Sequence, residues 1–173
     1  MDLMVDLEGL GTGPETTILT IAAQEFDPLV RGRLGRDYYV RVTLESQEGR
    51  SIEQGTIDWW ASQPAAVRDE AFAEEGRVPL QQALEGLHRI MWHAKRVWAQ
   101  GPTYDMNILE HAYKSLGMSL PWKYYSVRDS RTLFSLTPNL NSYPASHHAL
   151  EDCRRQINLL WDSLEYLKIR ELK

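Results

Sequence analysis

A sustained apolar stripe runs through the last part of the chain. Its members recur every three or four residues: Leu150, Cys153, Ile157, Leu160, Trp161, Leu164 and Leu167. This spacing predicts an α-helix with one apolar side. Such a helix must cover another layer of structure, so the rest of the chain has to supply a matching surface. Cys153 is the only cysteine, so no internal disulfide forms, and we expect it to pack within the stripe.

The first forty residues show a different period. Residues 1–8 alternate between apolar side chains on one side and a mixed set on the other, which includes Asp6 and Glu8. This alternation is typical of a β-strand. A glycine-rich turn and the β-branched run at residues 17–26 predict a second strand, and residues 38–42 predict a third. We therefore expect the chain to open with an antiparallel meander.

The apolar spacing becomes helical from residue 57 on. Helices are expected at residues 57–62, 65–73, 80–93, 104–116 and 131–136, and short strands at 97–99 and 124–127, before a turn-rich segment at 137–145. Strands followed by alternating helices and strands predict a mixed α/β fold. We expect one domain over residues 1–173, with a central sheet flanked by helices.

The composition is that of a folded protein, because 43% hydrophobic and 25% charged residues argue against disorder. No basic and apolar leader opens the sequence, and no apolar run approaches the roughly 20 residues that span a bilayer. These features predict a cytoplasmic protein with no membrane partner. The formal net charge of −5 argues mildly against a broad nucleic-acid-binding surface. That objection weakens where acids gather in a cation site.

Four acids stand where a cation site can form. Asp6 and Glu8 lie two residues apart on the first strand, so their side chains project from one face and repel each other unless water or a cation intervenes. Asp105 follows the strand at 97–99, and Asp152 lies in the first turns of the last helix. For each acid alone, a solvated strand end or a favourable helix dipole is the better explanation.

In chain order, however, these residues form a recognisable set of motifs. The motifs are Asp6-Leu7-Glu8, Tyr104-Asp105 and, with a histidine five residues before the acid, His147-His148-Ala149-Leu150-Glu151-Asp152. The set resembles the DEDD exonuclease superfamily, which has the ribonuclease H-like fold, and specifically its histidine-containing (DEDDh) branch. Residues 97–134 also resemble a small group of phage and bacterial 3′-to-5′ exoribonucleases.

The resemblance implies a 3′-to-5′ exonuclease that hydrolyses phosphodiester bonds from the 3′ end of a single strand and releases nucleoside 5′-monophosphates. Asp6, Glu8, Asp105 and Asp152 would hold two divalent cations, and oxygen ligands of this kind suit Mg²⁺ or Mn²⁺. His147 would be the general base that takes a proton from the attacking water, a role that suits an ordinary pKa of about 6.5.

Two details of the motifs need interpretation. Much of the superfamily has asparagine five residues before the second-motif acid, whereas this chain has Gln100, whose amide is expected to keep a supporting hydrogen bond. His148 occupies the position at which the sister branch places a tyrosine. The spacing favours His147 as the base, and His148 is interpreted as a loop or packing residue.

Residues beside the acids are candidates for substrate binding. Gly9 would let the backbone approach the terminal nucleotide, Leu10 would act as an apolar wedge against a base, and Tyr104 directly precedes the second-motif acid. A simple hairpin turn explains Gly9 and Leu10 equally well. Most large aromatic residues are expected in the core, although some could stack on unpaired bases. The candidates for phosphate contacts are Arg128, Arg131, Arg154 and Arg155.

Two other functions fit parts of the pattern. One is a catalytically silent nucleic-acid-binding module with the same fold, against which the complete set of acids and histidine argues. The other is an acidic α/β protein whose carboxylates are only surface charge. Cation binding separates these cases, because a preformed site gains stability from the cation. RNA is favoured over DNA as the substrate, and a homodimer is considered.

Overall fold

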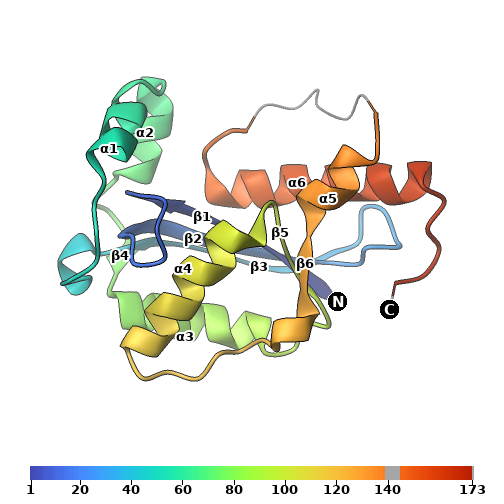
Figure 1. Cartoon of the computed structure of the whole chain (residues 1–173), viewed down its shortest axis with the longest axis horizontal. Coiled ribbons are helices and arrows are strands. Elements are labelled where there is room, and N and C mark those ends of the chain that lie inside the picture. The colour runs from blue at the N-terminus through green and yellow to red at the C-terminus, as the bar shows by residue number, and fades with distance from the viewer. Residues whose placement is uncertain (139–144, 173) are drawn as a thin grey trace.

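The computed structural model describes residues 1–138 and 145–172, and within these ranges the chain forms a six-stranded sheet of order β4-β3-β2-β1-β5-β6 (Figure 1). The strands are β1 (Asp2–Gly9), β2 (Ile18–Phe26), β3 (Leu34–Val42), β4 (Arg77–Val78), β5 (Val97–Ala99) and β6 (Val127–Asp129). The helices are α1 (Gln54–Ala61), α2 (Ala65–Ala71), α3 (Leu80–Met91), α4 (Pro102–Ser115), α5 (Ser130–Ser135) and α6 (Ala149–Tyr166), with 3₁₀ turns η1 (Leu44–Ser46) and η2 (Tyr124–Ser126).

Strand β1 is central to this sheet and is paired on both sides. It is antiparallel to β2, where Asp6 lies opposite Ala22 and Glu8 opposite Thr20, and it is parallel to β5. Strand β5 is in turn parallel to β6. The carboxyl ends of β1, β5 and β6 therefore meet at one edge of the sheet. The register of β1 shifts after Glu8, so regular pairing ends just beyond the two acids.

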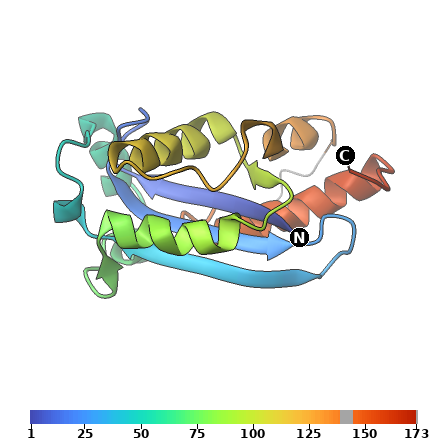
Figure 2. The same ribbon diagram turned by 90° about the horizontal axis from the view of Figure 1, so that it is seen from below.

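Helices cover both faces of the sheet (Figures 1 and 2). Helix α6 packs on β1 and β2, and α5 lies beside it. On the opposite face, α3 packs on β2 and β3, and α4 on β1 and β5. The short helices α1 and α2 stand at one end of the sheet (Figure 1). This arrangement leaves the carboxyl ends of the parallel strands beside the start of α6.

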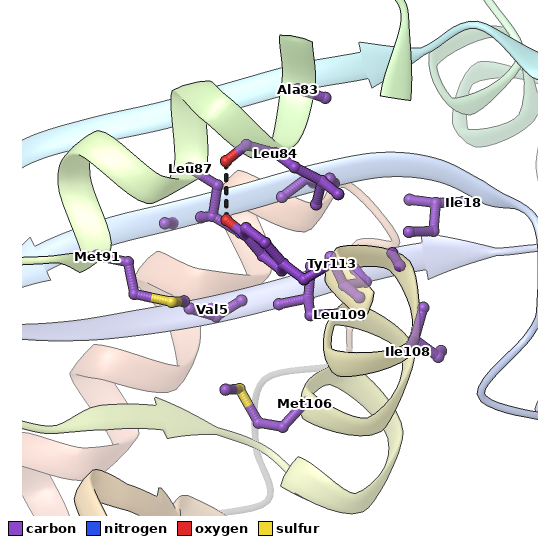
Figure 3. Close-up of a cluster of buried hydrophobic side chains, with 14 of the residues drawn as sticks. Val5, Ile18, Ala83, Leu84, Leu87, Met91, Met106, Ile108, Leu109 and Tyr113 are labelled. Carbon is purple, nitrogen blue, oxygen red and sulfur yellow. Dashed lines mark hydrogen bonds between the residues drawn. The ribbon is translucent and has the colours of Figure 1, made fainter. Parts of the chain in front are cut away.

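The alternation of β1 divides the core in two. Leu3 and Val5 pack with α3 and α4 in one cluster, whereas Met4 packs with the apolar stripe of α6, including Cys153, which is fully buried. Figure 3 shows the first cluster, in which the hydroxyl of Tyr113 donates to the carbonyl oxygen of Leu84 at 2.8 Å and ties α4 to α3. The even-numbered side chains of β1 thus face α6.

Most of the expected architecture is confirmed: a mixed α/β fold, an antiparallel β1-β2-β3 meander, and a long last helix with an apolar stripe. The strand expected at residues 124–127 is wrong, because Tyr124–Ser126 forms a 3₁₀ turn and the strand is β6. The tyrosines there are exposed and contact each other rather than the core, so their β-propensity is not supported by burial. The two-residue β4 was not expected. Residues 139–144 of the turn-rich segment lie outside the described residues.

None of the helices in residues 1–138 and 145–172 is long and apolar enough to cross a bilayer.

Candidate active site

All four predicted acids and the predicted histidine line one cleft. This acid cleft, with a volume of about 290 Å³, lies at the carboxyl ends of β1 and β5 and the start of α6. Its lining includes Asp6, Glu8, Asp105, His147 and Asp152. Residues up to 146 positions apart in the chain are therefore brought together, as the order of the motifs predicted.

Asp105 is positioned by the sharp reversal between β5 and α4. Gly101 has φ 95°, a left-handed conformation that disfavours other residues, and Pro102 then occupies the start of the helix. A Cβ on Gly101 would lie 3.2 Å from the guanidinium of Arg131, so the turn is also tightly packed. Asp105 follows within the first turn, and its Oδ1 accepts from the backbone N–H of Leu7 at 3.1 Å. This hydrogen bond joins α4 directly to β1 between its two acids.

Asp152 holds the segment that precedes α6. Its carboxylate accepts from the backbone N–H of Ser146 at 3.0 Å and of His147 at 2.7 Å, and from Arg155 Nε at 2.9 Å. His147 has φ 56°, which is strained for a residue with a side chain. The hydrogen bond from its own N–H to Asp152 stabilises that conformation and keeps His147 at the cleft.

The two histidines have different surroundings. A ring nitrogen of His147 and carboxylate oxygens of Glu8 and Asp152 all lie within 4.8 Å of one another. The His147 ring also meets the indole of Trp59 edge-on, with centroids 4.9 Å apart.

His148 instead caps the start of α6 and belongs to a packed cluster. Its ring stacks on Tyr39 with centroids 4.6 Å apart, and its Nε2 lies 3.5 Å from Glu70 Oε1. These contacts agree with the interpretation of His148 as a packing residue.

The first-strand acids are poorly neutralised by the protein. Asp6 Oδ1 accepts from Gln156 Nε2 at 2.7 Å, and among the described residues neither Asp6 nor Glu8 pairs with a lysine or arginine. Burial, followed by the neighbouring acids, raises the pKa of Asp6 well above its usual range. Burial raises the pKa of Glu8 to about 8, with Asp152 and Asp105 adding repulsion. Burial likewise raises the pKa of Asp105 to about 7.

This donor set fits divalent cations. It offers converging carboxylate oxygens whose mutual repulsion a cation would relieve, together with an imidazole nitrogen. In addition, Gln156 is 2% exposed and its Oε1 has no hydrogen-bond partner among the described residues. A buried oxygen acceptor without a partner, on the wall of an acid cleft, is suited to a water that hydrates a cation.

Gln100 keeps a hydrogen bond, as expected from its place in the second motif. Its Oε1 accepts from Arg155 Nη2 at 3.1 Å, and Arg155 also donates to Asp152, so the amide supports the third motif through an arginine. Arg131 donates to the Gln100 carbonyl at 3.0 Å. Both arginines line the acid cleft.

The other two arginine candidates lie elsewhere. Arg154 pairs with Asp37 and Glu151, and Arg128 donates to the backbone carbonyls of Tyr125 and Val127. Neither is among the residues that line the acid cleft.

A second groove, of about 490 Å³, continues from the acid cleft. This side groove shares Leu7, Glu8 and Tyr104 with the cleft and is further lined by residues that include Gly9, Glu53 and Trp59. The hydroxyl of Tyr104 donates to the Gly11 carbonyl at 3.4 Å. Gly9 is closely packed, since a Cβ there would lie 3.0 Å from that hydroxyl, which is tighter than an ordinary contact. Two of the three predicted substrate-binding residues, Gly9 and Tyr104, therefore border an open groove.

Leu10 requires a correction. Its side chain is 2% exposed and packs against Leu19 and Trp60, so it cannot act as a wedge against a base. The motif pattern was misleading because it marks the chain position but not the direction of the side chain. The indole of Trp60 also donates to the Gly9 carbonyl at 3.0 Å, which fixes this turn from the core side.

Sequence reasoning missed two residues of the site. Gln156 lies four residues after Asp152 and so on the same side of α6, a spacing that could have revealed it. Glu53 comes from a distant segment, and its carboxylate accepts from the backbone N–H of Thr12 at 2.9 Å. No local sequence pattern predicts this contact.

The fold and the cleft together define a class of protein: a DEDDh 3′-to-5′ exonuclease domain, with four acids and a histidine on a ribonuclease H-like sheet. Within that class, the chain belongs to the family described as the 3′-5′ exoribonuclease Rv2179c-like domain, whose model matches residues 1–163.

The individual relatives share little sequence identity with this chain. An exodeoxyribonuclease of Enterobacteria phage T4 is 23% identical over 95% of this chain and 89% of its own length. Among solved structures, the nuclease domain of 3′hExo, a DEDDh family member bound to rAMP, matches with a TM-score of 0.65 at 14% identity, covering 99% of this chain and 94% of that one. Exonuclease X in complex with 5′ overhanging duplex DNA matches with a TM-score of 0.59 at 17% identity, covering 96% and 92%.

Proposed function

We propose that this protein removes nucleotides one at a time from the 3′ end of single-stranded nucleic acid, with RNA favoured over DNA, and releases nucleoside 5′-monophosphates. The observation that carries the proposal is the convergence of four carboxylates and His147 in one cleft. Family membership supports the direction of the reaction. The poorly neutralised acids support a dependence on divalent cations.

Asp6, Glu8, Asp105 and Asp152 would hold two divalent cations, Mg²⁺ or Mn²⁺. Such cations, when bound, offset charge on the phosphate and favour deprotonation of water. His147 lies beside Glu8 and Asp152 and accepts the proton of the attacking water at a ring nitrogen. The Asp152 hydrogen bond to its backbone holds the imidazole at this point.

The remaining cleft residues bind and orient the substrate. Arg131 and Arg155 line the cleft and present guanidinium groups to phosphate oxygens. The side groove takes the terminal nucleoside, with Gly9 allowing close approach of the backbone and the 40% exposed indole of Trp59 offering a stacking surface. Trp59 also contacts His147, so a nucleoside in the side groove would lie next to the proposed general base.

The preference for RNA rests on the family description and on the side groove. The carboxylate of Glu53, which borders the groove, is a hydrogen-bond acceptor that a ribose 2′-hydroxyl can donate to. The relatives include proteins named for or bound to either polymer: an exodeoxyribonuclease, a complex with duplex DNA and a complex with rAMP. The preference is therefore measured directly in the experiment below.

The test follows the degradation of 3′-labelled and 5′-labelled single-stranded RNA and DNA with Mn²⁺. We expect the native chain to release the 3′ label first and to shorten the 5′-labelled strand stepwise, faster for RNA. Asp6→Ala and His147→Ala should abolish this pattern, whereas the matched control His148→Ala should retain it. A native chain that binds but cleaves neither polymer would replace the proposal with the silent binding module.

A further inference from the structure

A third groove lies at the opposite end of the parallel strands from the acid cleft. This basal groove, with a volume of about 570 Å³, is lined chiefly by Trp92, Lys95, Trp122, Lys123 and Tyr125. These residues stand in the two segments that lead into β5 and β6, whereas the acid cleft is built where β5 ends. The two sites are therefore separated by the length of a short strand.

Two aromatic side chains of the basal groove are exposed, and neighbouring rings contact its two indoles. Trp92 is 61% exposed and Tyr125 58%. The ring of His88 lies nearly parallel to Trp92, with centroids 5.5 Å apart, and Tyr113 meets Trp122 edge-on at 5.7 Å. Contact with His88 orients the exposed indole of Trp92, and Trp122 is partly buried against the core. Rings presented in this way suit stacking with planar groups.

The charge of the basal groove is opposite to that of the whole protein. Lys95 and Lys123 are both exposed, and none of the described residues that line the groove is an aspartate or glutamate. Lys123 Nζ lies 5.8 Å from the ring centroid of Tyr125, so cation and aromatic surface alternate. In a chain with a net charge of −5, such a surface is complementary to a polyanion.

We propose that the basal groove binds a single-stranded segment of nucleic acid, with bases stacked on Trp92 and Tyr125 and phosphates near Lys95 and Lys123. Aromatic rings interleaved with cations are the chemistry by which proteins hold unpaired strands without reading their sequence. That this strand is also the substrate rests on the proposed exonuclease function.

The location sets a minimum length for such a substrate. Strand β5 has three residues, and a strand of that length spans roughly 10 Å. A nucleic acid with its 3′ end in the acid cleft must therefore extend over several nucleotides to reach the basal groove. A dinucleotide fills only the cleft, whereas a longer strand gains the second contact.

A second copy of this chain fits the groove less well. Lysine is depleted from the buried parts of protein interfaces. A two-fold contact would also set the patch against itself, so that Lys95 and Lys123 of both copies would face one another without acids between them. A polyanion satisfies both lysines at once.

The test measures the affinity of single-stranded RNA and DNA 12-mers by fluorescence anisotropy in EDTA, which prevents hydrolysis. Trp92→Ala and Lys123→Ala should each weaken binding about tenfold. Lys123→Ala should also lower the slope of log affinity against log salt by about 0.7. Tyr166→Ala and Lys168→Ala are matched controls that should leave affinity unchanged, since both side chains are exposed, Tyr166 at the end of α6 and Lys168 just after it.

The outcomes separate this proposal from the exonuclease function. Equal affinity of all variants for the 12-mers would overturn the basal groove as a binding site. Unchanged affinity together with a change from dimer to monomer in the groove variants would assign the surface to a second copy. Hydrolysis of a labelled dinucleotide with Mn²⁺ does not involve the groove, so its absence in the native chain would overturn the proposed function alone.

Discussion

Strand β1 carries acidic side chains on one face at both of its ends, and the acids at the two ends differ in their basic partners. Asp2, at the amino end, is 1% exposed and accepts from Arg96 Nε at 2.8 Å. Asp6 and Glu8, at the carboxyl end, pair with no lysine or arginine in the described part of the chain, and only Asp6 is supported, by the amide of Gln156. One end has its counter-charge supplied by the fold and the other does not.

This difference is the one expected between a carboxylate that stabilises the fold and carboxylates that, as we propose, hold cations. A buried acid with an internal cation holds two elements together, as Asp2 does for β1 and β5, where Trp98 Nε1 also donates to it at 2.8 Å. Partly buried acids without one destabilise the fold while they are charged, and desolvation accordingly raises the pKa of Glu8 to about 8. Such an arrangement persists where an external cation or substrate supplies the missing charge.

The largest expected effect is that of Asp6→Asn. This change keeps the shape of the side chain but removes a charged oxygen from the cation site, so hydrolysis of labelled RNA should fall by at least about a thousandfold. Without divalent cations, the same variant should have a higher free energy of unfolding than the native chain at about pH 8, because it removes an acid whose ionisation folding disfavours. Urea denaturation in EDTA checks the second part. A loss of stability in Asp6→Asn would break the comparison.

The same isosteric change at the other end should have the opposite sign. Asp2→Asn leaves Arg96 without its carboxylate, and breaking a buried pair in this way lowers the free energy of unfolding by about 3 kcal/mol. The rate of hydrolysis by the folded protein should not change. Asp37→Asn is the control, since Asp37 pairs with Arg154 at an exposed position and its loss should alter stability by less than about 1 kcal/mol. Equal effects of the two variants would contradict a structural role for Asp2.

The sequence predicted those elements in which a regular apolar pattern continues over many residues and marks one face. The alternation of residues 1–8 and the stripe of the last helix were sufficient to place β1 and α6, because each period implies a face and each face needs a partner. The meeting of the four acids was implied by the resemblance of the motifs to the DEDDh exonucleases. The parallel pairing of β1 and β5 places Asp105, which follows β5, beside the acids of β1.

Other parts of the site depend on contacts that no local pattern records. Glu53 reaches the side groove because the chain after β3 returns beside the first turn, where Glu53 N–H donates to the Leu10 carbonyl at 2.7 Å. The burial of Leu10 depends on Trp60, fifty residues away in the chain. The strand expected at residues 124–127 was misplaced for a similar reason, because Tyr124 is 90% exposed and its ring contacts only the neighbouring Tyr125 among the described aromatic residues.

The dependence of stability on pH offers a third, smaller test. An acid whose pKa is raised by folding binds its proton more tightly in the native state, so its contribution is most favourable below the unfolded pKa and is lost as pH rises toward the native pKa. For Glu8, whose ordinary pKa of 4.5 is raised to about 8, the metal-free protein should therefore lose stability between about pH 5 and about pH 8.

Divalent cations should reverse this loss, because they bind the deprotonated acids. Mn²⁺ at about one hundred times its dissociation constant should raise the free energy of unfolding by about 2.7 kcal/mol. At one fixed Mn²⁺ concentration, the gain should be larger at about pH 8 than at about pH 5. Urea denaturation at both pH values, with and without Mn²⁺, measures the effect. Without metal, Glu8→Gln should weaken the dependence of the free energy of unfolding on pH. A native chain whose stability rises with pH without metal would contradict the idea that the protein leaves these acids without a counter-charge.

The smallest expected effect concerns Gln156, which gives Asp6 its single neutral partner. Gln156→Ala removes the hydrogen bond at 2.7 Å and the unpartnered buried Oε1, and outer partners of this kind typically contribute about tenfold to metal affinity. Calorimetric titration with Mn²⁺ should show about that loss. Gln24→Ala is a matched control, because Gln24 is an equally buried amide that donates to backbone carbonyls outside the cleft. If both variants bind Mn²⁺ with the affinity of the native chain, the Gln156 amide does not contribute to cation binding. The acids of β1 would then be stabilised by the cation alone.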